Sequence, residues 1–181
     1  MKSVKTAWAV TAVVIVLSAL FGCNRSLAAL RSQAMSLAIH GSGSGYSILT
    51  DCQDMVDTAR NLSTVSQKYL PGDHKSLARL DSLCDQLEDL GVRGDMAVRG
   101  QTVLELRAAC RDVQTELDGH GQVSDKDRGY LSGFAVDLDA AMARMEKDPY
   151  NDAARDFNRA KGRFPANLLG FMIGAMDPIE F

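Results

Sequence analysis

Apolar residues recur every three to four positions over several long segments of this chain, the spacing that places them on one face of an α-helix. Five such stripes are present: Met55-Val56-Ala59-Leu62-Val65, Leu77-Leu80-Cys84-Leu87-Leu90, Val103-Leu106-Cys110-Val113-Leu117, Leu131-Phe134-Leu138-Ala141-Met145 and Tyr150-Ala153-Phe157-Ala160-Phe164. A stripe of this kind cannot face water over several turns, so the helices are expected to pack against one another with nearly parallel axes. The pattern predicts an all-α domain built as an antiparallel, up-and-down helical bundle.

The segments between the stripes carry residues that end or begin helices. Breaks are expected at 41–45 (Gly-Ser-Gly-Ser-Gly), 71–72 (Pro-Gly), 91–94 and 119–121. The Gly/Ser run is typical of a flexible connector, since it lacks the Lys-Ser/Thr pair of a phosphate-binding loop. Ser124 with Asp127 has the pattern of a helix start. Asp148 before Pro149 predicts that a helix begins again there.

A membrane anchor is predicted at the N-terminus. The run from Thr6 to Cys23 carries no charge and is dense in Ala, Val, Ile and Leu. A helix needs about 20 apolar residues to span a bilayer, with a lower limit near 17. Trp8 lies near the start of the run, where its ring favours the headgroup layer. We therefore expect residues 1–23 to form an N-terminal transmembrane helix and residues 24–181 to form one helical bundle domain.

Processing of this N-terminal segment leaves three alternatives open. A retained helix is the favoured interpretation. Leu20-Phe21-Gly22-Cys23 resembles a bacterial lipoprotein signal, in which Cys23 would be lipidated and the residues before it removed, although Phe21 is bulky for such a site. Ordinary secretory cleavage is the third alternative, and Ser18-Ala19-Leu20 matches such a site poorly. All three place the remaining chain at a membrane or beyond it.

Charges on either side of the anchor give a small preference for its orientation. Lys2, Lys5 and the α-amino group precede the apolar run, whereas Arg25 and Arg31 follow it. Because positive charge is retained on the cytoplasmic side, the N-terminus is expected in the cytoplasm and the domain outside it. A domain that faces the cytoplasm is the alternative.

The charge balance and the spacing of the cysteines disfavour two classes of function, nucleic-acid binding and zinc binding. The chain has 20 Lys and Arg against 23 Asp and Glu, which disfavours nucleic-acid binding because that function needs a dense positive surface. The cysteines are scattered, without the close pairs of a zinc site. Cys84 and Cys110 are expected as small core residues, and a disulfide among Cys52, Cys84 and Cys110 is left open.

No constellation in the sequence supports catalysis. The histidines His40, His74 and His120 fall at expected loops or helix ends without a second ligand at helical spacing. The run from Asp125 to Gly129 resembles a calcium loop only vaguely, since its Gly comes one residue early and the closing Glu is absent. We therefore predict no catalytic residue, no metal ligand, no cofactor and no small-molecule substrate, and we expect a protein that is not an enzyme.

The residues after position 150 combine paired aromatic and Asn residues with Pro and Gly. They are Tyr150-Asn151, Phe157-Asn158, Phe164-Pro165 with Asn167, Gly170-Phe171 and the terminal Phe181. This set resembles the LemA family of bacterial membrane proteins. The resemblance is carried by residues 150 to 181, with fainter matches at Asn24-Arg25 and Leu27 to Arg31, and the Gly/Ser run departs from the family pattern. The chain is accordingly similar to a divergent member.

The resemblance implies a bacterial membrane protein with a short N-terminal membrane helix and a long helical bundle. It brings no catalytic or cofactor-binding residues, so the motif residues are expected to be structural. From the residues themselves, Asn167 is expected to cap a short helix. The apolar residues Leu168, Leu169, Phe171, Met172 and Ile173 are expected to close the end of the bundle, with contact to the bilayer surface as the alternative.

The functional expectation is a non-enzymatic, single-pass protein of the bacterial inner membrane, with the soluble domain in the periplasm. The membrane is one partner, through the N-terminal segment, and a protein of the cell envelope is expected as the other in an interaction or scaffold role. The alternative is an envelope lipoprotein, lipidated at Cys23, with a structural or small-ligand-binding role.

Overall fold

The computed structural model describes residues 2–43, 45–119, 121, 123–169 and 173–179. Within these ranges every regular element is helical and there is no strand. The elements are α1 (Lys2–His40), α2 (Ile48–Ser66), α3 (Lys75–Asp89), α4 (Met96–Gly119), α5 (Asp125–Glu146), α6 (Pro149–Lys161) and the short 3-10 helix η1 (Ala166–Leu169). The expected all-α fold is confirmed.

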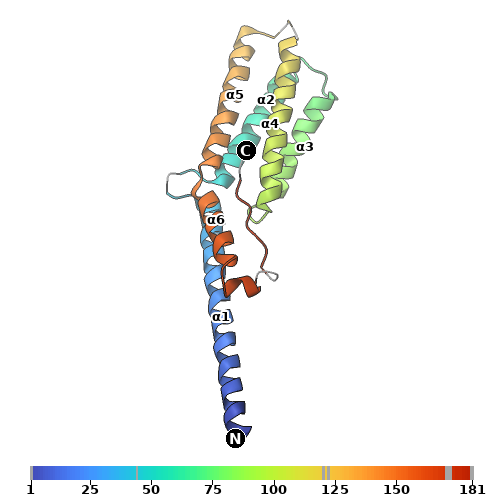
Figure 1. Ribbon diagram of the computed structural model, residues 1–181. Helices are drawn as coiled ribbons and strands as arrows, with labels where there is room; N and C mark the ends of the chain where they lie inside the picture. The colour runs from blue at the N-terminus through green and yellow to red at the C-terminus, as the bar shows by residue number, and fades with distance from the viewer. Residues whose placement is uncertain (1, 44, 120, 122, 170–172, 180–181) are drawn as a thin grey trace.

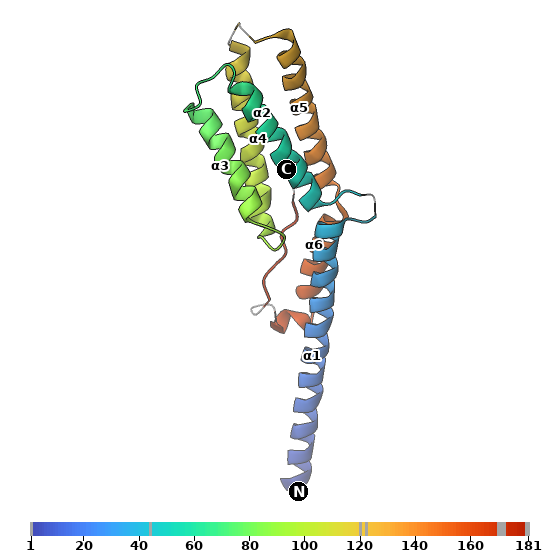
Figure 2. The same ribbon diagram turned by 180° about the vertical axis from the view of Figure 1, so that it is seen from behind.

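Helices α2 to α5 form an up-and-down bundle in which successive helices run in opposite directions (Figures 1 and 2). The main contacts join α2 with α5, α3 with α4 and α2 with α3, so α2 lies at the centre of the packing. Helix α1 extends from one end of this bundle as a long rod, and α6 runs back along its second half in the opposite direction. The expected antiparallel bundle behind an N-terminal apolar helix is therefore confirmed.

The apolar stripes predicted from the sequence form the core. On α4 the five stripe residues from Val103 to Leu117 are all buried, and Leu106 is fully inaccessible to solvent. Cys84 and Cys110 are buried core residues, as predicted. The stripe on α5 is buried except at Phe134, which is half-buried.

One stripe prediction is wrong at its end. Phe164 was expected on the buried face of the last helix, but α6 ends at Lys161 and Phe164 is 79% exposed. The buried face of α6 instead comprises Tyr150, Asn151, Ala154 and Phe157. Gly162 is the C-cap residue of α6, and Pro165 prevents a further turn because it has no N–H to donate to the carbonyl of Lys161 and its ring would clash with that carbonyl.

Helix α1 does not end where the predicted anchor ends. It continues through Cys23 to His40, since the intervening residues are good helix formers and the single Gly22 costs only about 1 kcal/mol in a helix. Its second half packs on α6 and η1 through Leu27, Ala34 and Ala38. The break at 41–45 is confirmed, and Gly41 is required there because its φ is +67° and a Cβ would overlap the carbonyl oxygen of Tyr46.

Two of the three predicted helix caps are confirmed. The Ser124 hydroxyl accepts a hydrogen bond from the backbone N–H of Asp127, and the Asp148 carboxylate accepts one from the N–H of Tyr150. The prediction for Asn167 is wrong, because it lies inside η1 rather than ahead of it. The N–H of Asn167 donates to the carbonyl of Arg163, so the backbone of the preceding turn satisfies this N–H at the start of η1.

Candidate functional site

The first half of α1 is largely uncovered by the rest of the described chain. Every described side chain from Thr6 to Ala19 is exposed, including Trp8 at 73% and Ile15 at 62%. The hydroxyl of Thr11 donates to the carbonyl of Ala7, so this polar group is satisfied within the helix. One helix of the described chain, starting in this segment, is long and apolar enough to cross a membrane. Apolar residues on all sides are typical of a helix surrounded by lipid.

The change from the exposed half of α1 to the packed half occurs over two turns. Leu20 and Cys23 are half-buried, Phe21 is 70% exposed, and Leu27 is 2% exposed. Cys23, the predicted lipidation residue, therefore lies at the boundary with its side chain against the core. A span of about 20 residues at 1.5 Å each covers the roughly 30 Å of a bilayer, so a membrane boundary near Cys23 matches the geometry.

The C-terminal segment returns to the bundle through hydrogen bonds from Asn151. The Asn151 side-chain amide nitrogen donates to the carbonyls of Met145 (2.9 Å) and Glu146 (3.0 Å), and its oxygen accepts from the N–H of Ile179 (2.7 Å). Asn151 is 2% exposed and Ile179 is 1% exposed. One buried amide thus joins the end of α5 to the C-terminal segment.

A second amide acts in the same way two turns further along α6. Asn158 donates to the carbonyl of Met176 (2.6 Å) and accepts from its N–H (3.0 Å), as a peptide group would. A further bond holds the C-terminal segment between Met176 and Ile179, where the hydroxyl of Tyr150 donates to the carbonyl of Asp177 at 2.8 Å. Burial raises the pKa of this tyrosine to about 12, so its hydroxyl keeps its proton. We call this set of contacts the C-terminal clamp.

The clamp corrects the prediction for bundle closure. Met176 and Ile179 are buried, and Ile179 lies over Gly100 on α4, whereas Leu168 is 50% exposed. Of the predicted residues 168–173, Ile173 packs against the core, but the buried residues Met176 and Ile179 lie further along the chain. Phe171 and Met172, which belonged to that prediction, lie outside the described residues.

The predicted family-motif residues fall into three groups. Tyr150, Asn151, Phe157 and Asn158 form the packed face of α6 and the clamp. Phe164 and Pro165 lie in the turn at the far end of α6, and Asn167 lies in η1. Gly170 and Phe171 lie outside the described residues. The spacing of seven between the two aromatic-Asn pairs places both amides on one helix face, and this signal could have revealed the clamp from the sequence.

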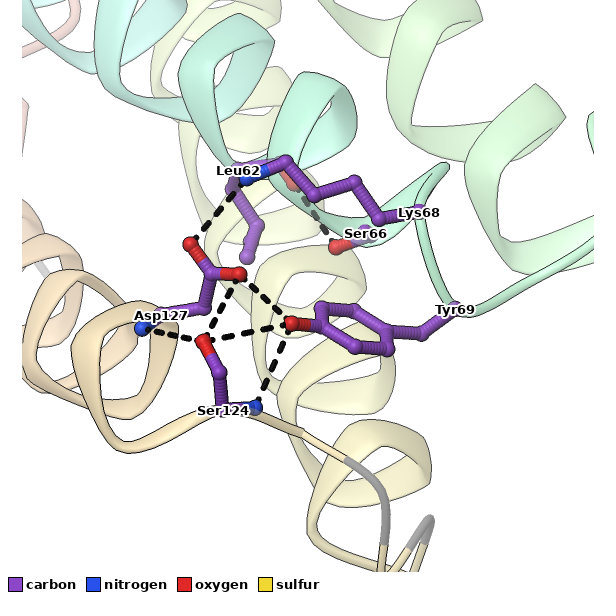
Figure 3. Close-up of polar contacts among 6 residues, drawn as sticks. All are labelled: Leu62, Ser66, Lys68, Tyr69, Ser124 and Asp127. Atoms are coloured by element: carbon purple, nitrogen blue, oxygen red, sulfur yellow. Dashed lines mark hydrogen bonds and ion pairs between the residues drawn. The ribbon is translucent and has the colours of Figure 1, made fainter.

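A polar cluster ties the C-terminal end of α2 to the start of α5, at the end of the bundle away from α1 (Figure 3). The Tyr69 hydroxyl donates to Asp127 Oδ2 (2.5 Å) and accepts from the backbone N–H of Ser124 (3.2 Å). Lys68 pairs with Asp127 Oδ1 at 3.1 Å. The Tyr69 hydroxyl and then Lys68 hold the pKa of the Asp127 carboxyl below its usual value. A carboxylate of lowered pKa is a weak base, so the cluster favours a structural tie over activation of the Ser124 hydroxyl.

An ion pair joins the start of α2 to the end of α5. Arg144 Nε donates to Asp51 Oδ1 (2.5 Å), its NH2 group donates to Asp54 (3.1 Å), and its guanidinium stacks 4.6 Å from the ring centre of Tyr46. Asp51 is 1% exposed, and burial raises its pKa against the opposing effect of Arg144. A shallow, mostly polar cleft beside this pair has a volume of about 310 Å³. The pair fixes the base of α2 against α5.

A buried arginine lines a smaller cleft of about 180 Å³ among α2, α3 and α4. Arg99 is 3% exposed, and its guanidinium donates to the carbonyl of Gly91 at 2.5 Å. Its Nε has no hydrogen-bond partner among the described residues. Cys52 lines the same cleft, and burial raises the pKa of its thiol to about 11. No sequence pattern indicated this arginine, because its burial depends on α2 and α3, which are distant from it along the chain.

The remaining candidate residues are dispersed over the fold. The thiols of Cys52, Cys84 and Cys110 are buried and free, and burial raises the pKa of Cys110 to about 12. His40 is exposed at the end of α1, His74 lies 3.4 Å from a carboxylate oxygen of Glu116, and His120 lies outside the described residues. Within the described part of the chain, His, Cys, Asp and Glu form no group of three that could hold a metal ion.

Comparison with known proteins gives no further assignment. No protein-family model, no curated protein and no solved structure matches this chain.

Proposed function

We propose that this protein is a non-enzymatic, single-pass protein of the bacterial cell envelope that holds a helical bundle at the inner membrane and presents it to a protein partner. The observation that carries the proposal is the division of α1. Its first half is apolar and uncovered, and its second half packs into the domain without a break. An uncovered apolar helix is unfavourable in water and favourable in lipid.

Two further observations support an interaction role. The buried polar residues around Asn151, Asp127 and Asp51 hold helices or the C-terminal segment in place, which accounts for these clusters without a substrate. The same holds for the predicted motif residues on α6, whose contacts are structural. The resemblance to the LemA family is part of the proposal and rests on the sequence motifs at residues 150 to 181.

The proposed orientation places the bundle in the periplasm, and labelling tests it. Ser124 is exposed at the end of the bundle furthest from the anchor, so Ser124→Cys offers a reporter when the four native cysteines are replaced by Ala or Ser. We expect an impermeant thiol reagent to label it in cells with a permeabilised outer membrane. Labelling only after full lysis would place the domain in the cytoplasm.

Photo-crosslinking in intact cells tests the partner. Val136 on α5 is 67% exposed and Val98 on α4 is 50% exposed, so either can carry a photoreactive residue without loss of core packing. We expect a discrete protein adduct from at least one of these positions. A photoreactive residue at Ile15 provides the control, because lipid adducts are expected there. Lipid adducts at Ile15 with no protein adduct at either bundle position would refute the interaction role.

The alternative is an envelope lipoprotein, and one observation favours keeping it. No described side chain before Cys23 belongs to the core or packs against it, so removal of the chain before Cys23 would leave the domain intact. Incorporation of labelled fatty acid that is lost in Cys23→Ala would establish lipidation. Membrane retention of the Cys23→Ala protein at full length would assign the anchoring to the helix instead.

A further inference from the structure

The turn that follows α6 lies at the end of the domain nearest the uncovered half of α1 (Figures 1 and 2). Helix α6 runs antiparallel to α1 from the bundle towards this point, and η1, which follows the turn, contacts α1. We call residues 162–169, the turn together with η1, the proximal turn. If α1 crosses a bilayer with its boundary near Cys23, the proximal turn lies at the level of the headgroups.

The proximal turn exposes large apolar side chains. Phe164 is 79% exposed, the highest value among the large apolar residues of the described chain, and Leu168 is 50% exposed. Leu169 beside them is half-buried. Aromatic and aliphatic side chains of this kind insert between lipid headgroups when a segment lies in the interface.

Charge around the proximal turn has one sign. No acidic residue occurs between Asp156 and Asp177, whereas Arg159, Lys161 and Arg163 fall in that interval. Arg159 is paired with Asp156, which leaves Lys161 and Arg163 as the charges closest to the turn.

The same sign continues along α1, and the bundle has the opposite sign. No acidic residue precedes Asp51, and α1 contributes Arg25 and Arg31 on the side of the domain. All acidic residues other than Asp177 and Glu180 lie between Asp51 and Asp156, where they outnumber the basic ones. An anionic membrane would therefore attract the proximal turn and repel the bundle.

We propose that the proximal turn is a second membrane contact, with Phe164 and Leu168 placed among the headgroups of an anionic bilayer and Lys161 and Arg163 close to the lipid phosphates. The proposal rests on the membrane anchoring proposed above. The occupant is a lipid surface rather than a protein, because the turn is joined to the anchoring helix at the depth of the membrane boundary. Each basic residue near such a surface contributes about 1 kcal/mol, roughly a fivefold effect on the contact equilibrium.

The test uses tryptophan fluorescence of the full-length protein in vesicles of phosphatidylcholine with and without phosphatidylglycerol. Trp8, the single native tryptophan, reports on the anchor. The reporter for the turn is Phe164→Trp in a Trp8→Phe background, and the matched control is Val136→Trp in the same background, since Val136 is exposed on the bundle. Quenching by brominated lipid and by aqueous acrylamide is measured for each.

We expect the indole at position 164 to be quenched by brominated lipid and shielded from acrylamide, more strongly when phosphatidylglycerol is present. The indole at position 136 should show the reverse. The double substitution Lys161→Gln with Arg163→Gln should remove the dependence on phosphatidylglycerol. Because positions 136, 161, 163 and 164 are not buried, the variants are expected to fold.

Two negative outcomes are distinguishable. If Trp8 is quenched by brominated lipid while the indole at position 164 behaves like the one at position 136, the second contact is refuted and the anchor stands. If Trp8 itself is not quenched by lipid, the proposed anchoring fails, and this inference fails with it. Equal shielding of the indole at position 164 in both vesicle types would overturn the part of the proposal that assigns a role to charge.

Discussion

Replacement of Asn151 by Ala should detach the C-terminal segment from the base of the bundle. The side chain makes three hydrogen bonds, and those with the Ile179 N–H and the Met145 carbonyl are buried. A buried donor left without a partner costs about 1–3 kcal/mol, and each hydrogen bond lost to the carbonyls of Met145 and Glu146 adds about 0.5–1.5 kcal/mol. The expected loss in the free energy of unfolding is therefore about 2–6 kcal/mol.

An upper limit follows from the ability of the segment to undock. If the unpaired N–H of Ile179 becomes too costly, the segment leaves the bundle and the protein loses the burial of Met176 and Ile179 instead. Full burial of such side chains is worth about 1.5–3 kcal/mol each. Asn151→Ala and Ile179→Ala act on one docking equilibrium, so their effects should be less than additive.

The assay is urea and thermal denaturation of the full-length protein in detergent, followed by circular dichroism. For a chain of this size, 1 kcal/mol corresponds to about 2–4 °C in the midpoint. Asn167→Ala provides the matched control, because Asn167 is exposed and exposed substitutions usually change stability by less than about 0.5 kcal/mol. Equal midpoints for Asn151→Ala and Asn167→Ala, or full additivity with Ile179→Ala, would refute the clamp.

Three further predictions follow from the core and its polar ties. Leu106→Asp should cost several kcal/mol because it buries an unpaired carboxylate, whereas Asp112→Ala should be nearly neutral because that side chain is 61% exposed; denaturation midpoints compare the two. The pKa of Asp127 is lowered on folding, so its stabilising effect is present above about pH 4 and is lost as the pH falls through the folded value. Asp127→Asn should therefore lose less stability than the native protein between pH 5 and pH 3 in the same assay. The thiols of Cys52, Cys84 and Cys110 are buried and have raised pKa values, so they should not react with an aqueous thiol reagent at neutral pH until the protein unfolds. Rapid labelling of the folded protein would contradict the packing.

The helices were predictable because each carries a local pattern. The stripe from Val103 to Leu117 specifies one buried face whatever the partner helix is, and Ser124 and Asp148 start helices through bonds to residues two or three places away. Such signals need no knowledge of the rest of the fold. The up-and-down arrangement follows from short connections between amphipathic helices.

The contacts that hold the helices together were not predictable in the same way. Asp51 and Arg144 are 93 residues apart, and an acidic residue near a helix start is ordinarily taken as exposed. Phe164 continued the stripe of α6 by spacing, but α6 ends at Lys161, ahead of Pro165, so Phe164 lies outside the helix. The apolar run at 168–173 was expected to close the end of the bundle. The hydrogen bonds of Asn151 and Asn158 instead hold Ile179 and Met176, which lie further along the chain.

Because α1 is one unbroken helix, its sequence length sets the orientation of the domain as well as its attachment. Each residue turns the helix by about 100° and advances it by about 1.5 Å. One residue inserted between Gly22 and Leu27 would thus swing the bundle and the proximal turn about 100° around the helix axis. Seven inserted residues would restore the azimuth to within about 20° while raising the domain by roughly 10 Å. A series of such insertions therefore separates two requirements. If the domain must face one direction, function recovers whenever the inserted length is close to a whole number of helical turns. If the domain must lie at a fixed height, function declines steadily with the inserted length.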